Sequence, residues 1–119
     1  TVSTLAGSGA QGSLDETAVS ASFDNPYGVA VTPDGNKAVV TDLGNNKIRL
    51  VDMATGTVST LAGSGAQGSL DETAVSASFD NPYGVAVTPD GNKAVVTDLG
   101  NNKIRLVDMA TGTVSTLAG

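Results

Sequence analysis

Four short segments rich in β-branched residues follow one another at a spacing of about ten residues, which favours strands joined by short hairpins. The segments are Val29–Thr32, Lys37–Thr41, Lys47–Val51 and Thr57–Leu61. Turn-forming residues separate them at Pro33–Asn36, Leu43–Asn46 and Ala54–Gly56. Gly and Asn tolerate the left-handed backbone that tight turns need, and Pro presets the first turn position. The pattern predicts a four-stranded antiparallel meander.

Polarity changes across this meander. The first two segments are almost wholly apolar, the third alternates charged residues with Ile48 and Leu50, and the fourth is rich in Ser and Thr. A sheet that is buried at one edge and wetter at the other has the shape of a wedge, and four-stranded wedges arranged around an axis form a β-propeller. The remaining segment, Ser8–Asn25, is expected to connect an outermost strand to the next innermost strand and to contain a short helical turn.

Residues 1–56 recur without a change as residues 57–112, and residues 113–119 begin the unit again. The chain therefore divides into residues 8–63 and 64–119, each a connector plus a blade, with residues 1–7 as a spare outermost strand. The unbroken identity indicates a designed sequence or a very recent duplication. A window cut from a longer tandem array remains open, and an intact-mass measurement separates these cases.

Two blades leave faces that need neighbours, because a repeat cannot bury its hydrophobic surfaces alone. We therefore expect an all-β chain that assembles with itself, head to tail, into a closed ring with an even number of blades. Eight blades, a tetramer of chains, are favoured over six blades, a trimer. A head-to-tail contact gives a finite ring when the rotation between copies closes, and otherwise it gives an open fibre.

The motifs of the unit resemble the NHL-repeat propeller motif. The resemblance rests on Asn25–Val31, Pro33–Asn36 and Val40–Arg49, and it departs at Ala38, where the family often places an aromatic residue. Val51–Gly56 is more similar to the related YVTN-type propeller repeat. Both families imply a propeller fold, and the resemblance also implies ring faces that hold a peptide, RNA or another partner.

Composition narrows the possible functions. The formal net charge of −6 argues against nucleic acid and anionic membranes as partners. Cys and His are both absent, so thiol chemistry and the usual general base of a nucleophilic triad are excluded. No apolar run is long enough to span a bilayer. No charged and then apolar leader opens the sequence, so a soluble protein of unknown localisation is expected.

Gly7–Gly12 reads as the glycine pattern of dinucleotide-binding folds, and Asp34 follows at a suitable distance. That site also needs a buried first strand and a long crossover helix. Here the preceding strand is rich in Ser and Thr, and tight hairpins follow. We therefore interpret the glycine run as a flexible connector between blades and expect no cofactor.

Four further groups have simple structural interpretations. Asp15 and Glu16 are expected to be first-turn acids of a short helix. Asp42 with Gly44, Asn45 and Asn46 does not match a calcium loop and is expected to bond to its own turn. Lys47, Arg49 and Asp52 are expected to form a solvated ion-pair ladder. Phe23 and Tyr27 are expected to pack between blades, with a face or the channel as the alternative for Tyr27.

No set of residues combines a nucleophile with a base, and no catalytic, cofactor-binding or metal-binding residue is predicted. The chain is expected not to be an enzyme. The favoured function is a symmetric self-assembling propeller scaffold. The alternative is an NHL-type binding module that uses a ring face to hold a partner.

Overall fold

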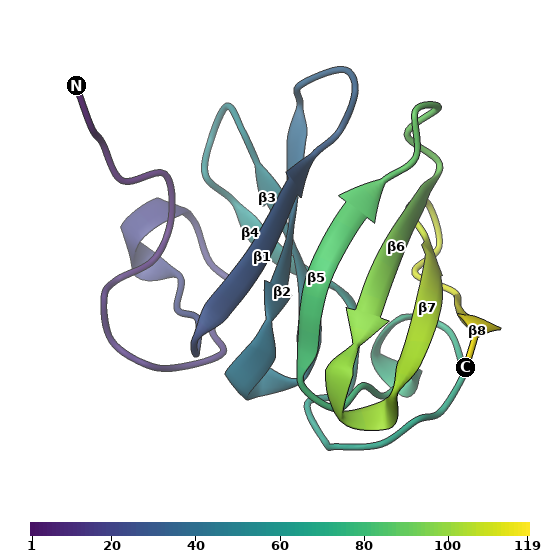
Figure 1. Cartoon of the computed structure of the whole chain (residues 1–119). Coiled ribbons are helices and arrows are strands. Elements are labelled where there is room, and N and C mark those ends of the chain that lie inside the picture. Colours follow the sequence, from purple (N-terminus) through teal and green to yellow (C-terminus); the bar gives the residue numbers. More distant parts are fainter.

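The computed structural model describes all 119 residues and contains two four-stranded antiparallel sheets that stand side by side (Figure 1). Blade 1 comprises β1 (Pro26–Val31), β2 (Lys37–Asp42), β3 (Lys47–Asp52) and β4 (Val58–Ala62). Blade 2 comprises β5 (Pro82–Val87), β6 (Lys93–Asp98), β7 (Lys103–Asp108) and β8 (Val114–Ala118). In each sheet the strands follow chain order. The predicted all-β fold, with two four-stranded meanders per chain, is confirmed.

Short turns fix the strand order because their residues supply the backbone conformations and hydrogen bonds that the turns need. The Asp34 carboxylate closes the β1–β2 turn by accepting bonds from the Asn36 backbone at 2.9 Å and the Thr32 hydroxyl at 2.7 Å. The β2–β3 turn is a 3₁₀ helix, η2 (Leu43–Asn45), that ends at Asn46 with a left-handed φ of 54°. Asparagine tolerates this conformation better than most residues. Blade 2 repeats the arrangement with η4 (Leu99–Asn101).

The connectors, residues 8–25 and 64–81, contain only one short helical turn each. These turns are the 3₁₀ helices η1 (Ala18–Ser20) and η3 (Ala74–Ser76). The rest forms no strand, and isolated bridges fix its course: Gln11 pairs with Phe23 of the same connector and Thr17 pairs with Thr57. Asp15 and Glu16 lie before η1, whose first turn holds no acid. Their predicted role as first-turn acids is therefore wrong.

Arg49 instead holds the first connector against blade 1. The guanidinium is fully buried and donates to Asp42 at 2.6 Å and to Asp15 at 2.7 Å. It also donates to the carbonyls of Leu14 and Ser22, and it lies 4.9 Å from the centre of the Phe23 ring. Arg105 makes the equivalent contacts in blade 2. A planar guanidinium suits this buried site because its five donors can all be satisfied.

The predicted ladder of Lys47, Arg49 and Asp52 is also wrong. The β2–β3 register sets Lys37 opposite Asp52, and these two form a 2.8 Å ion pair at the surface. Lys47 donates to the Ser13 hydroxyl at 2.6 Å. The connector covers Arg49 on the face that it shares with Lys47, so no solvated ladder forms there. Asp42 likewise bonds beyond its own turn, because it accepts the Asp24 backbone N–H as well as the Asn45 amide.

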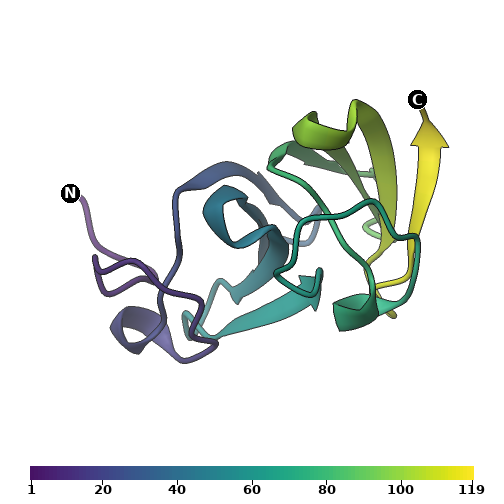
Figure 2. The same cartoon turned by 90° about the horizontal axis from the view of Figure 1, so that it is seen from below.

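The main hydrophobic core lies between the blades, and a smaller one lies between blade 1 and the first connector. The larger core joins residues of both sheets: Val39, Ile48, Ala62, Ala77, Phe79, Ala94, Val96, Val107 and Val114. Seen from below, the N and C ends lie at opposite ends of the molecule (Figure 2). Each blade therefore has one face toward the other blade and one face toward solvent.

Residues 1–7 form no strand in this chain. Val2 is 96% exposed, whereas Val58 and Val114 at the same position of later units are 2% exposed. The two equivalents are buried because they belong to β4 and β8. None of the helices in the structure has the length and apolar character needed to cross a membrane.

Candidate functional site: the blade-to-blade interface

The interface between the blades is formed mainly by β1 and β2 of blade 1 against β5 of blade 2, and β4 of blade 1 also contacts η3 of the second connector. Val39, Ile48 and Ala62 of blade 1 pack with Phe79 and Val96 of blade 2, and all five are fully buried. Alternation along the strands places these apolar side chains on one face. Burial of aliphatic and aromatic area gives this contact its stability.

A hydrogen-bond chain crosses the interface between the inner strands. The Thr41 hydroxyl accepts the Gly28 backbone N–H at 2.8 Å and donates to the Tyr83 carbonyl at 2.6 Å. A β-carbon at Gly28 would lie only 2.6 Å from the Tyr83 carbonyl oxygen. Glycine is therefore required here for the close approach of β1 and β5, and it also lets Thr41 reach the neighbouring blade.

Asn46 fixes the second connector to blade 1. Its side-chain carbonyl accepts the Asn81 backbone N–H at 2.9 Å, and its amide donates to the Gly65 carbonyl at 3.4 Å. The left-handed backbone of Asn46 ends η2 and directs this side chain across the interface. One residue thus serves both the turn and the joint between blades.

Tyr27 and Tyr83 meet at the start of the inner strands. Their ring centres lie 3.8 Å apart, the rings are tilted by 34°, and the two hydroxyls are hydrogen bonded. The bond to Tyr27 raises the pKa of the Tyr83 phenol above its ordinary value. Both rings remain exposed on one side. The two tyrosines therefore pack between blades and also present a surface, which combines the two roles considered for Tyr27.

Identical residues have opposite burial in the two copies of the unit. Thr41 is fully buried and Thr97 is exposed, whereas Phe79 is fully buried and Phe23 is only partly buried. Ala62 is buried and Ala118 is exposed. Sequence cannot cause these differences, since the two copies are the same. They arise because each blade has a neighbour on one side only.

The chain consequently has two faces without a neighbour. We call the open side of blade 1 the leading face; it includes Phe23, Pro26, Tyr27, Val29 and Val40. We call the open side of blade 2 the trailing face; it includes Thr97, Leu99, Asn102, Ile104 and Ala118. Each is the repeat equivalent of a surface that is buried inside the chain.

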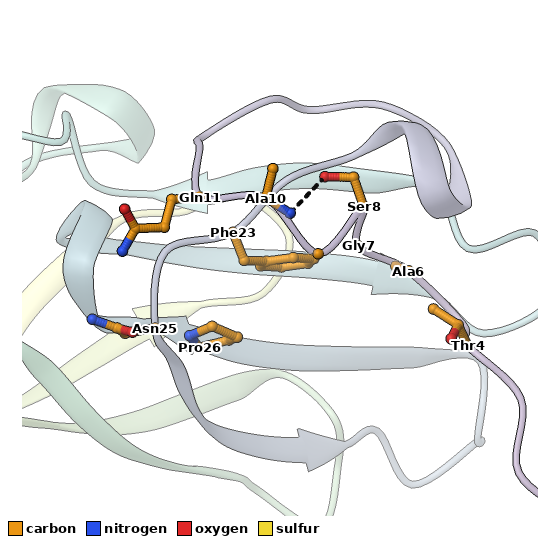
Figure 3. A pocket seen from close by; sticks show the side chains of 10 residues that line it. Thr4, Ala6, Gly7, Ser8, Ala10, Gln11, Phe23, Asn25 and Pro26 are labelled. Atoms are coloured by element: carbon orange, nitrogen blue, oxygen red, sulfur yellow. Dashed lines mark hydrogen bonds between the residues drawn. The ribbon is translucent and has the colours of Figure 1, made fainter.

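Three hollows lie on the leading and trailing faces. A cavity of about 540 Å³ is lined by residues 7–11 of the glycine run together with Thr4, Ala6, Phe23, Asn25 and Pro26 (Figure 3). An apolar hollow of about 300 Å³ lies beside it, over Val29 and Val40. On the trailing face a hollow of about 240 Å³ lies between Thr97 and Gly119. Their equivalents at the internal interface are filled by the adjacent blade.

The glycine run Gly7–Gly12 lies in the first connector and at its start, as predicted. It belongs to no strand-turn-helix unit. Ser8 accepts the Ala10 backbone N–H at 3.2 Å within it (Figure 3). The acidic residues form no group of three or more that could hold a metal ion. Sequence reasoning missed Thr41 and Asn46, whose partners lie in the other copy of the repeat; their only signal was their position at the ends of strands.

No protein-family profile matches the chain. NHL repeat-containing protein 2 of Bos taurus is 33% identical over 105 residues, which are 87% of this chain and 14% of the relative. The Homo sapiens protein of the same name is 32% identical over 107 residues, 89% of this chain and 15% of the relative. Protein SUPPRESSOR OF QUENCHING 1, chloroplastic, of Arabidopsis thaliana is 34% identical over 124 residues, 97% of this chain and 12% of the relative. The chain spans less than a sixth of each of these proteins.

Solved structures support the same fold. An auxiliary nutrient binding protein from Bacteroides thetaiotaomicron aligns with a TM-score of 0.67 at 23% identity, over 76% of this chain and 25% of the other. The PQQ-bound form of aldose sugar dehydrogenase from Streptomyces coelicolor aligns with a TM-score of 0.54 at 21% identity, over 87% of this chain and 31% of the other. The chain is therefore a pair of β-propeller blades homologous to NHL repeat-containing proteins.

Proposed function

We propose that the chain is a self-assembling propeller unit in which the trailing face of one copy docks on the leading face of the next. The observation that carries this proposal is the internal interface between the blades. Within one chain this interface joins the same two surfaces, with the same residues at every position, which supports the same contact between copies. A second copy is thus the partner whose shape and chemistry fit these faces.

The contacts follow from the repeat. Thr97 of one copy takes the part of Thr41 and donates to the Tyr27 carbonyl of the next copy. Asn102 takes the part of Asn46 and accepts the Asn25 backbone N–H. The trailing Ile104 packs toward the leading Phe23, as Ile48 and Phe79 do within the chain.

A head-to-tail contact between different faces closes only if the rotation between blades divides a full turn. Whole chains bring two blades each, so the ring has an even number. Eight blades from four chains are favoured and six from three are the alternative. The unchanged repeat supports a designed or recently duplicated origin, because drift has left no difference between copies.

A binding module is the second candidate. The exposed sides of Tyr27 and Tyr83 favour it, since aromatic rings with a hydroxyl are common at binding surfaces. A closed ring would present this pair at every blade; the peptide, RNA or other partner is what the resemblance to NHL repeats implies, and the net charge of −6 disfavours RNA among these.

Light scattering of the 119-residue chain tests the assembly. Four chains of 11.7 kDa give about 47 kDa and three give about 35 kDa, whereas a stable monomer of 11.7 kDa overturns the proposal. Val29→Glu supplies the matched variant, because Val29 is 64% exposed in the chain and lies on the leading face. We expect this variant to remain folded by circular dichroism and to lose the ring mass.

A further inference from the structure

Gly7, Gly63 and Gly119 occupy the same position of the repeat unit. Their surroundings indicate that residues 1–7 and 113–119 would compete for one strand position in an assembly. Gly63, at the end of β4, is buried between blades: a β-carbon there would lie 2.7 Å from the Asn46 carbonyl oxygen and 3.4 Å from the Phe79 ring. Gly7 has only the second neighbour, at 3.6 Å from Phe23. Gly119 has only the first, at 2.6 Å from the Asn102 carbonyl oxygen. Gly7 and Gly119 thus each have half of the surroundings of Gly63.

The end of the first segment is already docked as a strand end. The Gly7 N–H donates to the Ala18 carbonyl at 3.0 Å, as Gly63 donates to Ala74 at 3.0 Å. The Leu5 carbonyl lies against Gly56, as the Leu61 carbonyl lies against Gly112. Residues 5–7 therefore hold the position relative to blade 1 that the end of β4 holds relative to blade 2.

When the trailing face of one copy meets the leading face of the next, residues 1–7 and 113–119 cannot both fill the outermost strand position. The two segments have the same sequence, so their side-chain contacts there are equal. What differs is how the displaced segment leaves. Residues 1–7 would have to turn away at Gly7, whose equivalent Gly63 is buried between blades. Residues 113–119 leave at Thr113, which is exposed.

We propose that Thr1–Gly7 is a donor strand, which pairs with β7 of the neighbouring copy in place of β8. This inference rests on the proposed self-assembly. The register follows from the repeat: Leu106 pairs with Ser115 within the chain, so after exchange it pairs with Ser3 of the next copy. Val2, now almost fully exposed, gains the burial of Val114. The donor strand then continues directly into the first connector of its own chain, as β4 continues into the second connector.

Disulfide trapping in the full chain tests the exchange, and no native cysteine interferes. We choose the double variant Ser3→Cys with Leu106→Cys, because residues directly opposite on antiparallel strands have β-carbons close enough to be bridged with small adjustment. Most of the oxidised protein should run as covalent oligomers on a non-reducing denaturing gel. Only monomers on the gel, with the ring mass intact by light scattering, overturn the exchange.

Two further measurements keep this test decisive. Leu50→Cys with Ser59→Cys places the same pair at the internal β3–β4 position, where Leu50 lies opposite Ser59, and should form a disulfide within one chain. Leu106→Cys with Ser115→Cys should be trapped within one chain less completely than this control, because β8 is displaced; equal trapping contradicts the exchange. If the reduced Ser3→Cys, Leu106→Cys protein and the parent chain are both monomers by light scattering, the self-assembly itself fails.

Discussion

Thr41 donates a 2.6 Å hydrogen bond to the carbonyl of Tyr83, 42 residues away in the chain and on the adjacent blade. The equivalent Thr97 is exposed. Thr41→Val should lower the free energy of unfolding by about 1 kcal/mol, since it removes the hydrogen bonds of the buried hydroxyl to the Gly28 N–H and the Tyr83 carbonyl. Thr97→Val is the matched control and should change the unfolding of the isolated chain little while weakening assembly. Urea unfolding at low and high protein concentration separates the two effects, and equal losses in the isolated chain would contradict them.

Arg49→Leu should destabilise blade 1 strongly. The change leaves the Asp42 carboxylate, which is fully buried, without its positive partner. Breaking a buried pair from one side costs about 3–5 kcal/mol. Urea unfolding measures this loss, and Arg49→Leu with Asp42→Asn should recover part of it. An unchanged urea midpoint for Arg49→Leu would show that the buried pair adds nothing.

The Lys37–Asp52 pair should make stability depend on acid pH. Hydrogen bonds from the Lys37 ammonium and from the Thr55 and Ala54 backbone hold the pKa of Asp52 well below its ordinary range. Because the folded pKa lies below the unfolded value of about 3.9, the pair stabilises the fold above that pH, and this contribution is lost as the pH falls further. Lys37→Met should raise the pKa of Asp52 in an NMR titration of carboxyl groups. Asp108 keeps Lys93 and serves as the internal control; an unmoved Asp52 midpoint refutes the assignment.

The glycine run should not bind a dinucleotide. Gly9 has a φ of 91° and no heavy atom within 4 Å of the position a β-carbon would take, as expected for an open connector. Isothermal titration with NAD should give no binding heat. Micromolar affinity that disappears in Gly9→Ala with Gly65→Ala would reverse this interpretation.

Deleting residues 1–7 should leave the ring mass and the thermal midpoint nearly unchanged. Residues 113–119 have the same sequence and already pair with β7, so they can complete the blade in place of the donor strand. Light scattering and a thermal melt by circular dichroism measure the two quantities. Loss of the ring mass in the deleted chain would show that the two segments do not substitute for each other.

The strands and turns were predictable because their signals are local. Alternation and turn residues located the four strands of the unit, and the position of Asn46 indicated a left-handed turn. The partners of Arg49 were not predictable in this way. Alternation shows that Lys47 and Arg49 share a face, but it cannot show that a connector bearing Asp15, 34 residues earlier, covers that face.

The blade-to-blade contacts were hidden from sequence for a different reason. Thr41 and Asn46 look like ordinary strand-end and turn residues within one unit, and their partners Tyr83 and Asn81 belong to the next unit. A pattern within one repeat carries no information on how far neighbouring units are rotated. Only the juxtaposition of the two sheets reveals which residues meet.

In the proposed ring, the close contact at Gly28 would make assembly respond to small changes as a threshold. A substitution made in both copies of the repeat unit changes Gly28 and Gly84 together. In a ring, the same change is then present at every contact between neighbouring inner strands. Effects at separate joints add, so a loss of about 0.5 kcal/mol per joint is multiplied by the number of joints. A ring that lacks one joint is open, and its population therefore falls much more steeply than the stability of any single blade. Mild variants of this unit should consequently divide sharply into those that close and those that stay as separate chains.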